Sequence, residues 1–145
     1  MPNFICIEGV DAVGKTEVAR ALANKLGFQY YKSPGVLFAD MRKIVDENVD
    51  PVTKYFFYRS ATQHDSYQIR LILETTGVVC DRYIYSTIAF HTAMDVRIRP
   101  LFELTQLVMP DHTFVLTARE DVRQTRLRKR TEINSLEKNL PLQQK

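Results

Sequence analysis

The stretch Phe4-Ile-Cys-Ile-Glu-Gly-Val-Asp-Ala-Val-Gly-Lys-Thr16 decides the fold of this 145-residue chain. It contains the pattern G-x-x-x-x-G-K-T between an apolar strand and a helical run. Glycines let the backbone curl closely around phosphates, and the N-terminus of a helix directs N–H groups at an anion. Lys15 suits the terminal phosphates, and the Thr16 hydroxyl suits Mg²⁺. The pattern predicts a loop that binds a nucleoside triphosphate through eight residues, Gly9, Val10, Asp11, Ala12, Val13, Gly14, Lys15 and Thr16.

Strands and helices alternate along the rest of the chain. Apolar runs predict strands at residues 3–8, 28–31, 78–81 and 112–117. Helical patterns predict helices at residues 15–26, 37–47, 51–74, 84–92, 101–108 and 119–130. Such alternation is typical of a parallel sheet with helices on both faces. We therefore expect an α/β fold of the P-loop NTPase type, a three-layer sandwich formed by a single domain over residues 1–145.

The composition limits the class of protein. A hydrophobic fraction of 45% and a charged fraction of 26% are ordinary for a soluble globular protein. The net charge of +3 is too small to indicate binding to nucleic acid or to a membrane surface. Cys6 and Cys80 both lie in apolar runs, which favours buried, reduced thiols in a cytoplasmic protein. No apolar run is long enough for a membrane-spanning helix.

A second candidate site, Asp81-Arg82-Tyr83, follows the third predicted strand. Open α/β sheets bind their ligands outside the carboxyl ends of the strands. Asp81 suits a role on Mg²⁺ or on its water, and Arg82 suits a bridge between donor and acceptor phosphates, since phosphoryl transfer depends on positioning and charge neutralisation. The alternative is that Asp81 caps the following helix and Arg82 is a solvated surface charge.

Three motifs in this order resemble the thymidylate kinase family: EGVDAVGKT at residues 8–16, DRYIYSTIAFH at residues 81–91, and the arginine-rich stretch at residues 119–130. The resemblance covers residues 3–140. It implies an enzyme that transfers the γ-phosphate of ATP to dTMP or a related deoxynucleotide, with Mg²⁺. It also implies an acceptor-binding region at residues 32–75 and, at residues 119–137, a lid over the ATP phosphates.

The resemblance also implies roles for individual residues. Asp11 would lie near the sugar and phosphate of the acceptor, and Arg42 and Arg82 would hold the acceptor phosphate. Phe57 would stack on the base, with Thr87 and Phe90 as further contacts. The catalytic groups would be Lys15, Asp81, Arg82 and the lid residues Arg126 and Arg130, with Thr16 and Asp81 as metal ligands.

Other positions depart from the family pattern. Lys32-Ser-Pro-Gly35 stands in place of R-E-P-G-G, and Ala61 in place of an arginine that contacts the base. Phe90-His91 replaces a tyrosine and a glutamine, and Asn134-Ser135 replaces D-R in the lid. Two alternatives stay open, the first because of the changes at base- and sugar-reading positions, and the second because of the altered lid and the missing C-terminal portion of the family. One is a kinase for another acceptor, such as a nucleoside, with Glu8 or Asp11 as base; the other is a non-catalytic nucleotide-binding module.

Family members continue through a further strand and helix after the lid, whereas this sequence ends at Lys145. We expect the last strand and helix to be absent. A missing edge strand would expose unpaired backbone and apolar surface, which favours self-association. The resemblance therefore leads us to expect a homodimer whose ligands are nucleotides.

Overall fold

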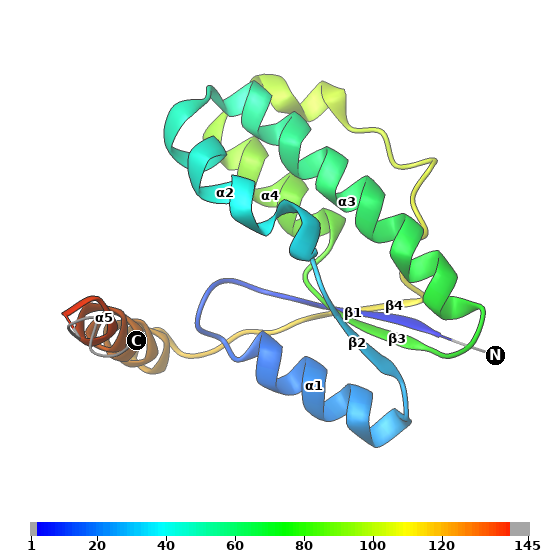
Figure 1. Ribbon diagram of the computed structural model, residues 1–145, viewed down its shortest axis with the longest axis horizontal. Coiled ribbons are helices and arrows are strands. Elements are labelled where there is room, and N and C mark those ends of the chain that lie inside the picture. The colour runs from blue at the N-terminus through cyan, green and yellow to red at the C-terminus, as the bar shows by residue number, and fades with distance from the viewer. Residues whose placement is uncertain (1–2, 140–145) are drawn as a thin grey trace, which may run out of the picture.

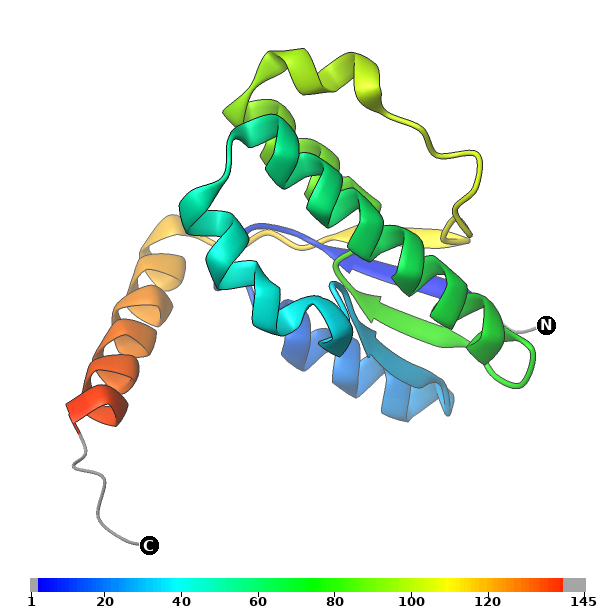
Figure 2. The same cartoon turned by 45° about the horizontal axis from the view of Figure 1, so that its top comes forward.

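The computed structural model describes residues 3–139, and these form a four-stranded parallel sheet between two layers of helices (Figure 1). The strand order is β2-β3-β1-β4. Helix α1 covers one face of the sheet, while α3 and α4 lie on the other with α2 beside α3 (Figures 1 and 2). The elements in chain order are β1 (Phe4–Glu8), α1 (Lys15–Leu26), β2 (Gln29–Lys32), α2 (Val36–Asn48), α3 (Pro51–Leu73), β3 (Val78–Asp81), α4 (Ile84–Met94), the 3₁₀ helix η1 (Val96–Leu101), β4 (His112–Val115) and α5 (Glu120–Asn139).

The two central strands carry the core. All residues of β1 and β3 are buried, and successive side chains point to opposite faces of the sheet. Phe4 and Cys6 pack in the cluster under α3 and α4, whereas Ile5 and Ile7 pack against α1 around the small side chain of Ala19. The near-continuous apolar character of these strands therefore reflects burial on both faces, as expected for a parallel sheet.

The two cysteines lie opposite each other in this core. Cys6 pairs in register with Cys80 on the neighbouring strand, and both are buried free thiols, as predicted. Burial is the largest cause that raises the pKa of each thiol, which keeps both protonated and unreactive at neutral pH.

Local capping signals correctly fixed two helix boundaries. Helix α1 ends at Gly27, whose φ of 66° is the left-handed conformation that glycine adopts readily. Helix α3 begins after Asp50, whose carboxylate accepts the N–H groups of Val52 and Thr53 at 3.0 and 3.1 Å. Pro51 occupies the first helical position, where its missing N–H costs nothing.

The predicted helix at residues 101–108 is wrong. The 3₁₀ helix ends at Leu101, and the segment that follows runs to β4 without regular structure. Side chains of α3 bond to the backbone of this segment and so replace the hydrogen bonds of a helix. Tyr55 donates to the carbonyl of Leu101, Arg59 donates to that of Glu103, and the Ser66 hydroxyl accepts the N–H of Val108.

Helix α5 starts at Glu120, one residue later than predicted, and projects away from the sheet (Figures 1 and 2). The side chains of Asn134 and Ser135 lie outside the described residues. The expected absence of the family's last strand and helix concerns positions after 139, which are also outside them. Between residues 3 and 139, no helix combines the length and the apolar character needed to cross a membrane.

Candidate active site

Because all strands are parallel, the segments that follow β1, β2 and β3 meet at one edge of the sheet. The phosphate loop follows β1 and curls there as predicted. Gly9 has φ 141°, and a Cβ at this position would lie 2.5 Å from the carbonyl oxygen of Leu116, so a side chain has no room. Lys15 is buried, and its Nζ donates to the carbonyl of Val10 at 2.6 Å. Burial, then the charge of Arg82, lowers the pKa of Lys15.

The structure brings together the two predicted metal ligands, which are far apart in sequence. Thr16 Oγ1 donates to Asp81 Oδ2 at 2.6 Å, and Tyr30 Oη donates to the same oxygen at 3.3 Å. Asp81 is 2% exposed. A hydroxyl and a carboxylate beside a phosphate loop fit Mg²⁺, which usually takes one or two protein oxygens and completes its shell with phosphate and water. Residues 3–139 contain no cluster of three or more His, Cys, Asp or Glu that could hold a metal alone.

Arg82 lies directly after β3, and its guanidinium contacts three partners. It has φ 68°, and its Nη1 donates to Ser86 Oγ at 3.1 Å and to the carbonyl of Gly9 at 3.3 Å. Its Nη2 pairs with the carboxylate of Asp11. Arg82 is therefore anchored at the phosphate loop, which disfavours the alternative of a solvated surface charge.

The carboxylate of Glu8 fixes the start of α4. Its Oε1 accepts the N–H groups of Tyr83 at 3.0 Å and of Ser86 at 3.2 Å, and its Oε2 accepts the Ser86 hydroxyl. Glu8 therefore accepts the N–H groups at the start of α4. The alternative interpretation gave this capping role to Asp81, which does not cap the helix. Ser86 thus links buried Glu8 to Arg82, and the pair orients the guanidinium.

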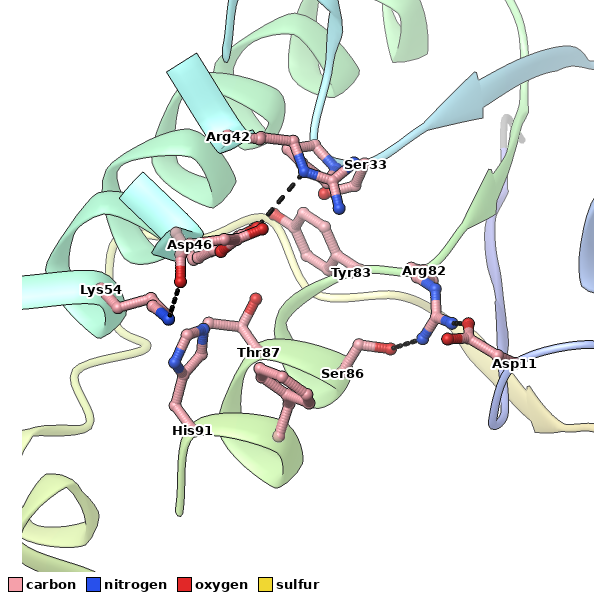
Figure 3. Close-up of a pocket in the computed structure, with 13 residues that line it drawn as sticks. Asp11, Ser33, Arg42, Asp46, Lys54, Arg82, Tyr83, Ser86, Thr87 and His91 are labelled. Carbon is pink, nitrogen blue, oxygen red and sulfur yellow. Dashed lines mark hydrogen bonds and ion pairs between the residues drawn. The ribbon is translucent and has the colours of Figure 1, made fainter. Parts of the chain in front are cut away.

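Two cavities open on either side of Arg82. The smaller, about 260 Å³, is lined by the phosphate loop with Asp81 and Arg130. The larger, about 490 Å³, lies between α2, α3 and α4 (Figure 3) and is within the range of roughly 300–1,000 Å³ of small-molecule sites. Asp11 and Arg82 line both cavities. The predicted residues in the larger one are Asp11, Arg42, Arg82, Thr87 and Phe90.

A family model described as thymidylate kinase matches residues 7–145. The chain belongs to the thymidylate kinase family. A thymidylate kinase of Wolbachia pipientis subsp. Culex pipiens is 31% identical over 129 residues, and this chain spans 63% of that relative's length. The same alignment covers 78% of this chain. A probable thymidylate kinase of Archaeoglobus fulgidus is 29% identical over 145 residues, covering 93% of this chain and 74% of the relative.

Solved structures support the fold. Thymidylate kinase from Ehrlichia chaffeensis superposes with a TM-score of 0.67 at 22% identity, covering 94% of this chain and 87% of the other. Thymidylate kinase from Candida albicans gives a TM-score of 0.67 at 19% identity, over 88% of this chain and 75% of the other. The predicted P-loop fold is confirmed.

The lid arginines of the family pattern reach the phosphate loop from α5. Arg126 donates to the carbonyl of Ala12 at 3.1 Å, and Arg130 lines the smaller cavity. Phe57, in contrast, is not among the residues that line the larger cavity. Its ring packs against Phe38 and Tyr58 at centroid distances of 5.6 and 5.3 Å, and it is Tyr58 that faces the cavity.

Ala61, which departs from the family pattern, and the nearby Arg59 both lie away from the larger cavity. Ala61 is fully buried and does not line the cavity. Arg59 is also turned away, because it donates to the carbonyl of Glu103 and to the side chain of Gln63. Neither residue is among those that line the larger cavity. The sequence prediction did not include six polar residues that line this cavity, Ser33, Asp46, Lys54, Tyr58, Ser86 and His91.

The buried carboxylate of Asp65 on α3 accepts hydrogen bonds from β2 and from the segment that follows it. Asp65 is 0% exposed and accepts hydrogen bonds from Ser33 Oγ at 2.6 Å, Tyr31 Oη at 2.8 Å and Gly35 N at 3.0 Å. A Cβ at Gly35 would lie 2.8 Å from Asp65 Oδ1, so this contact requires glycine. Ser33 and Pro34 line the larger cavity, and Asp65 therefore positions part of the wall of this cavity.

Asp65→Ala is expected to lower the free energy of unfolding by about 1–3 kcal/mol, because three donors lose their acceptor. Burial raises the pKa of Asp65, so removing this costly buried carboxylate offsets part of the loss. Urea denaturation measures the change, and Asp40→Ala at an exposed position of α2 is the control. Equal stability of the two variants would contradict the anchoring role.

Proposed function

We propose that the chain transfers the γ-phosphate of ATP to the 5′-phosphate of dTMP or a related deoxynucleotide, giving a nucleoside diphosphate and ADP. One observation carries this proposal: the cavity at the phosphate loop and the larger cavity share Asp11 and Arg82. A triphosphate in the loop and a monophosphate in the cavity would therefore meet at the Arg82 guanidinium. Membership of the thymidylate kinase family supports the same donor and acceptor.

Cations would surround the transferred group from three directions. Lys15 would contact the terminal phosphates of ATP, Arg82 would bridge donor and acceptor, and Arg126 and Arg130 would approach from α5. Because an acceptor phosphate is already a nucleophile, positioning and charge neutralisation suffice, and no general base is required. Bound Mg²⁺ would be held through Thr16 and Asp81 and would neutralise charge on the phosphates that it contacts.

The larger cavity would hold the acceptor. Arg42 lies on its α2 wall, where it suits the acceptor phosphate, and its Nε donates to Tyr58 Oη at 3.3 Å. Thr87 and Phe90 of α4 line the opposite wall and suit contacts to sugar and base. Phe57 would act indirectly in this arrangement, by supporting Tyr58 from behind.

The nucleoside-kinase alternative needs a free carboxylate near a 5′-hydroxyl. Glu8 is buried, lines neither cavity and is bonded to the start of α4. The carboxylate of Asp11 is paired with Arg82. Both candidates are thus engaged, and this favours a phosphorylated acceptor.

Release of ADP from Mg-ATP with a panel of acceptors tests the proposal. The panel contains dTMP, dUMP, dCMP, dAMP, dGMP and thymidine, with a reaction lacking acceptor as control. We expect turnover to require a nucleoside monophosphate. Faster turnover with thymidine would identify a nucleoside kinase instead. ATP binding without turnover on any acceptor would identify a binding module.

We also propose a cytoplasmic homodimer. The buried free thiols suit a reducing compartment. Exposed apolar side chains on α2, among them Val36, Leu37 and Ile44, offer surface that a second copy would cover. Sedimentation equilibrium tests this assembly, and a monomer at micromolar concentration would contradict it.

A further inference from the structure

The end of the larger cavity farthest from Arg82 holds a lysine and a histidine that face each other. Lys54 comes from the first turn of α3 and His91 from the last turn of α4. Figure 3 places both side chains at one end of the cavity, with Asp11 and Arg82 at the other. Lys54 is 9% exposed and His91 is 1% exposed, so both groups are largely withdrawn from solvent.

Each of these groups has unused hydrogen-bonding capacity. Among the described residues, Lys54 Nζ donates only to the carbonyl of Asp46, at 2.7 Å, and it forms no ion pair with their carboxylates. An ammonium has three N–H donors, so donors remain. His91 Nδ1 is buried and has no hydrogen-bond partner among these residues. Since unsatisfied buried polar groups are costly, the pair points to a ligand that fills both.

The charge state of His91 determines what it can bind. Burial lowers the pKa of His91, and the positive charge of Lys54 lowers it further, against the smaller opposing effect of Asp46. The imidazole is therefore neutral at pH 7 and has one nitrogen able to accept a hydrogen bond. Asp46 itself is exposed, and both of its carboxylate oxygens accept Tyr58 Oη at 3.0 Å. The buried groups thus offer one cationic donor and one neutral acceptor.

We propose that Lys54 and His91 select a keto pyrimidine, thymine or uracil, as the base of the acceptor nucleotide. This inference rests on the proposed function and names the base-selecting residues of the same site. The Lys54 ammonium donates to a ring carbonyl oxygen, and His91 Nδ1 accepts the adjacent imide N–H. Cytosine carries an amino group and an unprotonated nitrogen at the same edge. It would set N–H groups against the ammonium and a lone pair against the imidazole.

The position of Lys54 explains how the chain can do without the arginine that Ala61 replaces. Ala61 and Arg59 do not reach the cavity, whereas Lys54, two turns earlier on the same helix, does. Lys54 thus supplies a cationic donor from another position of α3.

Lys54→Met tests the inference, because methionine keeps the apolar stem and removes the charge and the donors. The readout is kcat/KM for dTMP, dUMP and dCMP at saturating Mg-ATP. We expect the native chain to prefer dTMP and dUMP. Lys54→Met should reduce the dTMP-to-dCMP ratio about 10- to 100-fold, since hydrogen bonds to a charged group contribute most to such discrimination. Lys54→Arg should retain selectivity, and Lys43→Met, at an exposed lysine of α2, should leave it unchanged.

A purely structural role for Lys54 would lower turnover of all acceptors together and leave the ratio unchanged, and this result would overturn the inference. If Lys54→Met does not fold in a thermal melt, His91→Phe carries the same test, since it removes the acceptor nitrogen and leaves Lys54 in place. A native chain that turns over dTMP and dCMP equally would overturn the selection of the base by Lys54 and His91 but would leave the proposed phosphoryl transfer standing. A native chain that binds ATP and turns over no nucleotide would overturn the proposed function with it.

Discussion

Lys15→Ala is expected to reduce phosphoryl transfer by about 10³-fold or more, because it removes the cation that we propose to contact the terminal phosphates of ATP. In the structure Lys15 Nζ donates to the carbonyl of Val10, so the ammonium is held inside the loop. The rate is measured as ADP release at saturating acceptor. The same variant should bind ATP more weakly in calorimetry, because the lost charge also acts in the ground state.

Lys25→Ala is the matched control, since Lys25 lies exposed in the last turn of the same helix. It should keep native activity and stability. A thermal melt must show Lys15→Ala folded, because Lys15 is buried. A folded Lys15→Ala variant with turnover near that of the native chain would show that the loop is not the donor site.

Arg82→Ala is expected to lower kcat by about 10²- to 10³-fold and to raise KM for the acceptor, while the affinity for ATP changes little. Arg82 lines both cavities, and its guanidinium is fixed by Ser86 and Asp11. Removing it takes away the group that would touch both phosphates. The three constants come from initial-rate kinetics with dTMP and from ATP titration.

Arg82→Gly separates the guanidinium from the backbone. Arg82 has φ 68°, a conformation that costs about 1–2 kcal/mol for arginine or alanine and nothing for glycine. Both variants should lose activity equally, although the glycine variant should be the more stable. Native activity in Arg82→Gly would mean that backbone geometry matters there and the charge does not. Arg70→Ala, at an exposed position of α3, is the control for surface charge.

The parts of the fold that local chemistry determines were predictable. The phosphate loop, the end of α1 at Gly27 and the start of α3 at Asp50 each depend on a few neighbouring residues. The segment at residues 101–108 was not predictable in this way. Its apolar spacing resembles that of a helix, but its backbone bonds to Tyr55, Arg59 and Ser66 of a distant helix. Tertiary hydrogen bonds outweighed local propensity there.

The same limit applies to the candidate site. The predicted partners Thr16 and Asp81 meet because parallel strands bring their carboxyl ends together, which a sequence pattern can indicate. The lining of the larger cavity depends instead on how three helices are rotated against one another. Phe57 and Tyr58 are neighbours in sequence, yet only Tyr58 faces the cavity, since successive helical residues point about 100° apart. Lys54 carried one usable signal, a lysine at the head of an aromatic run.

Following the labelled γ-phosphate tests directly whether the chain transfers it from ATP to dTMP. The native chain is incubated with [γ-³²P]ATP, Mg²⁺ and dTMP, and the nucleotides are separated. We expect label to appear in dTDP in a 1:1 ratio with the ADP formed, as transfer between two adjoining sites requires. Label released only as inorganic phosphate, or retained in ATP with dTMP unchanged, would contradict it.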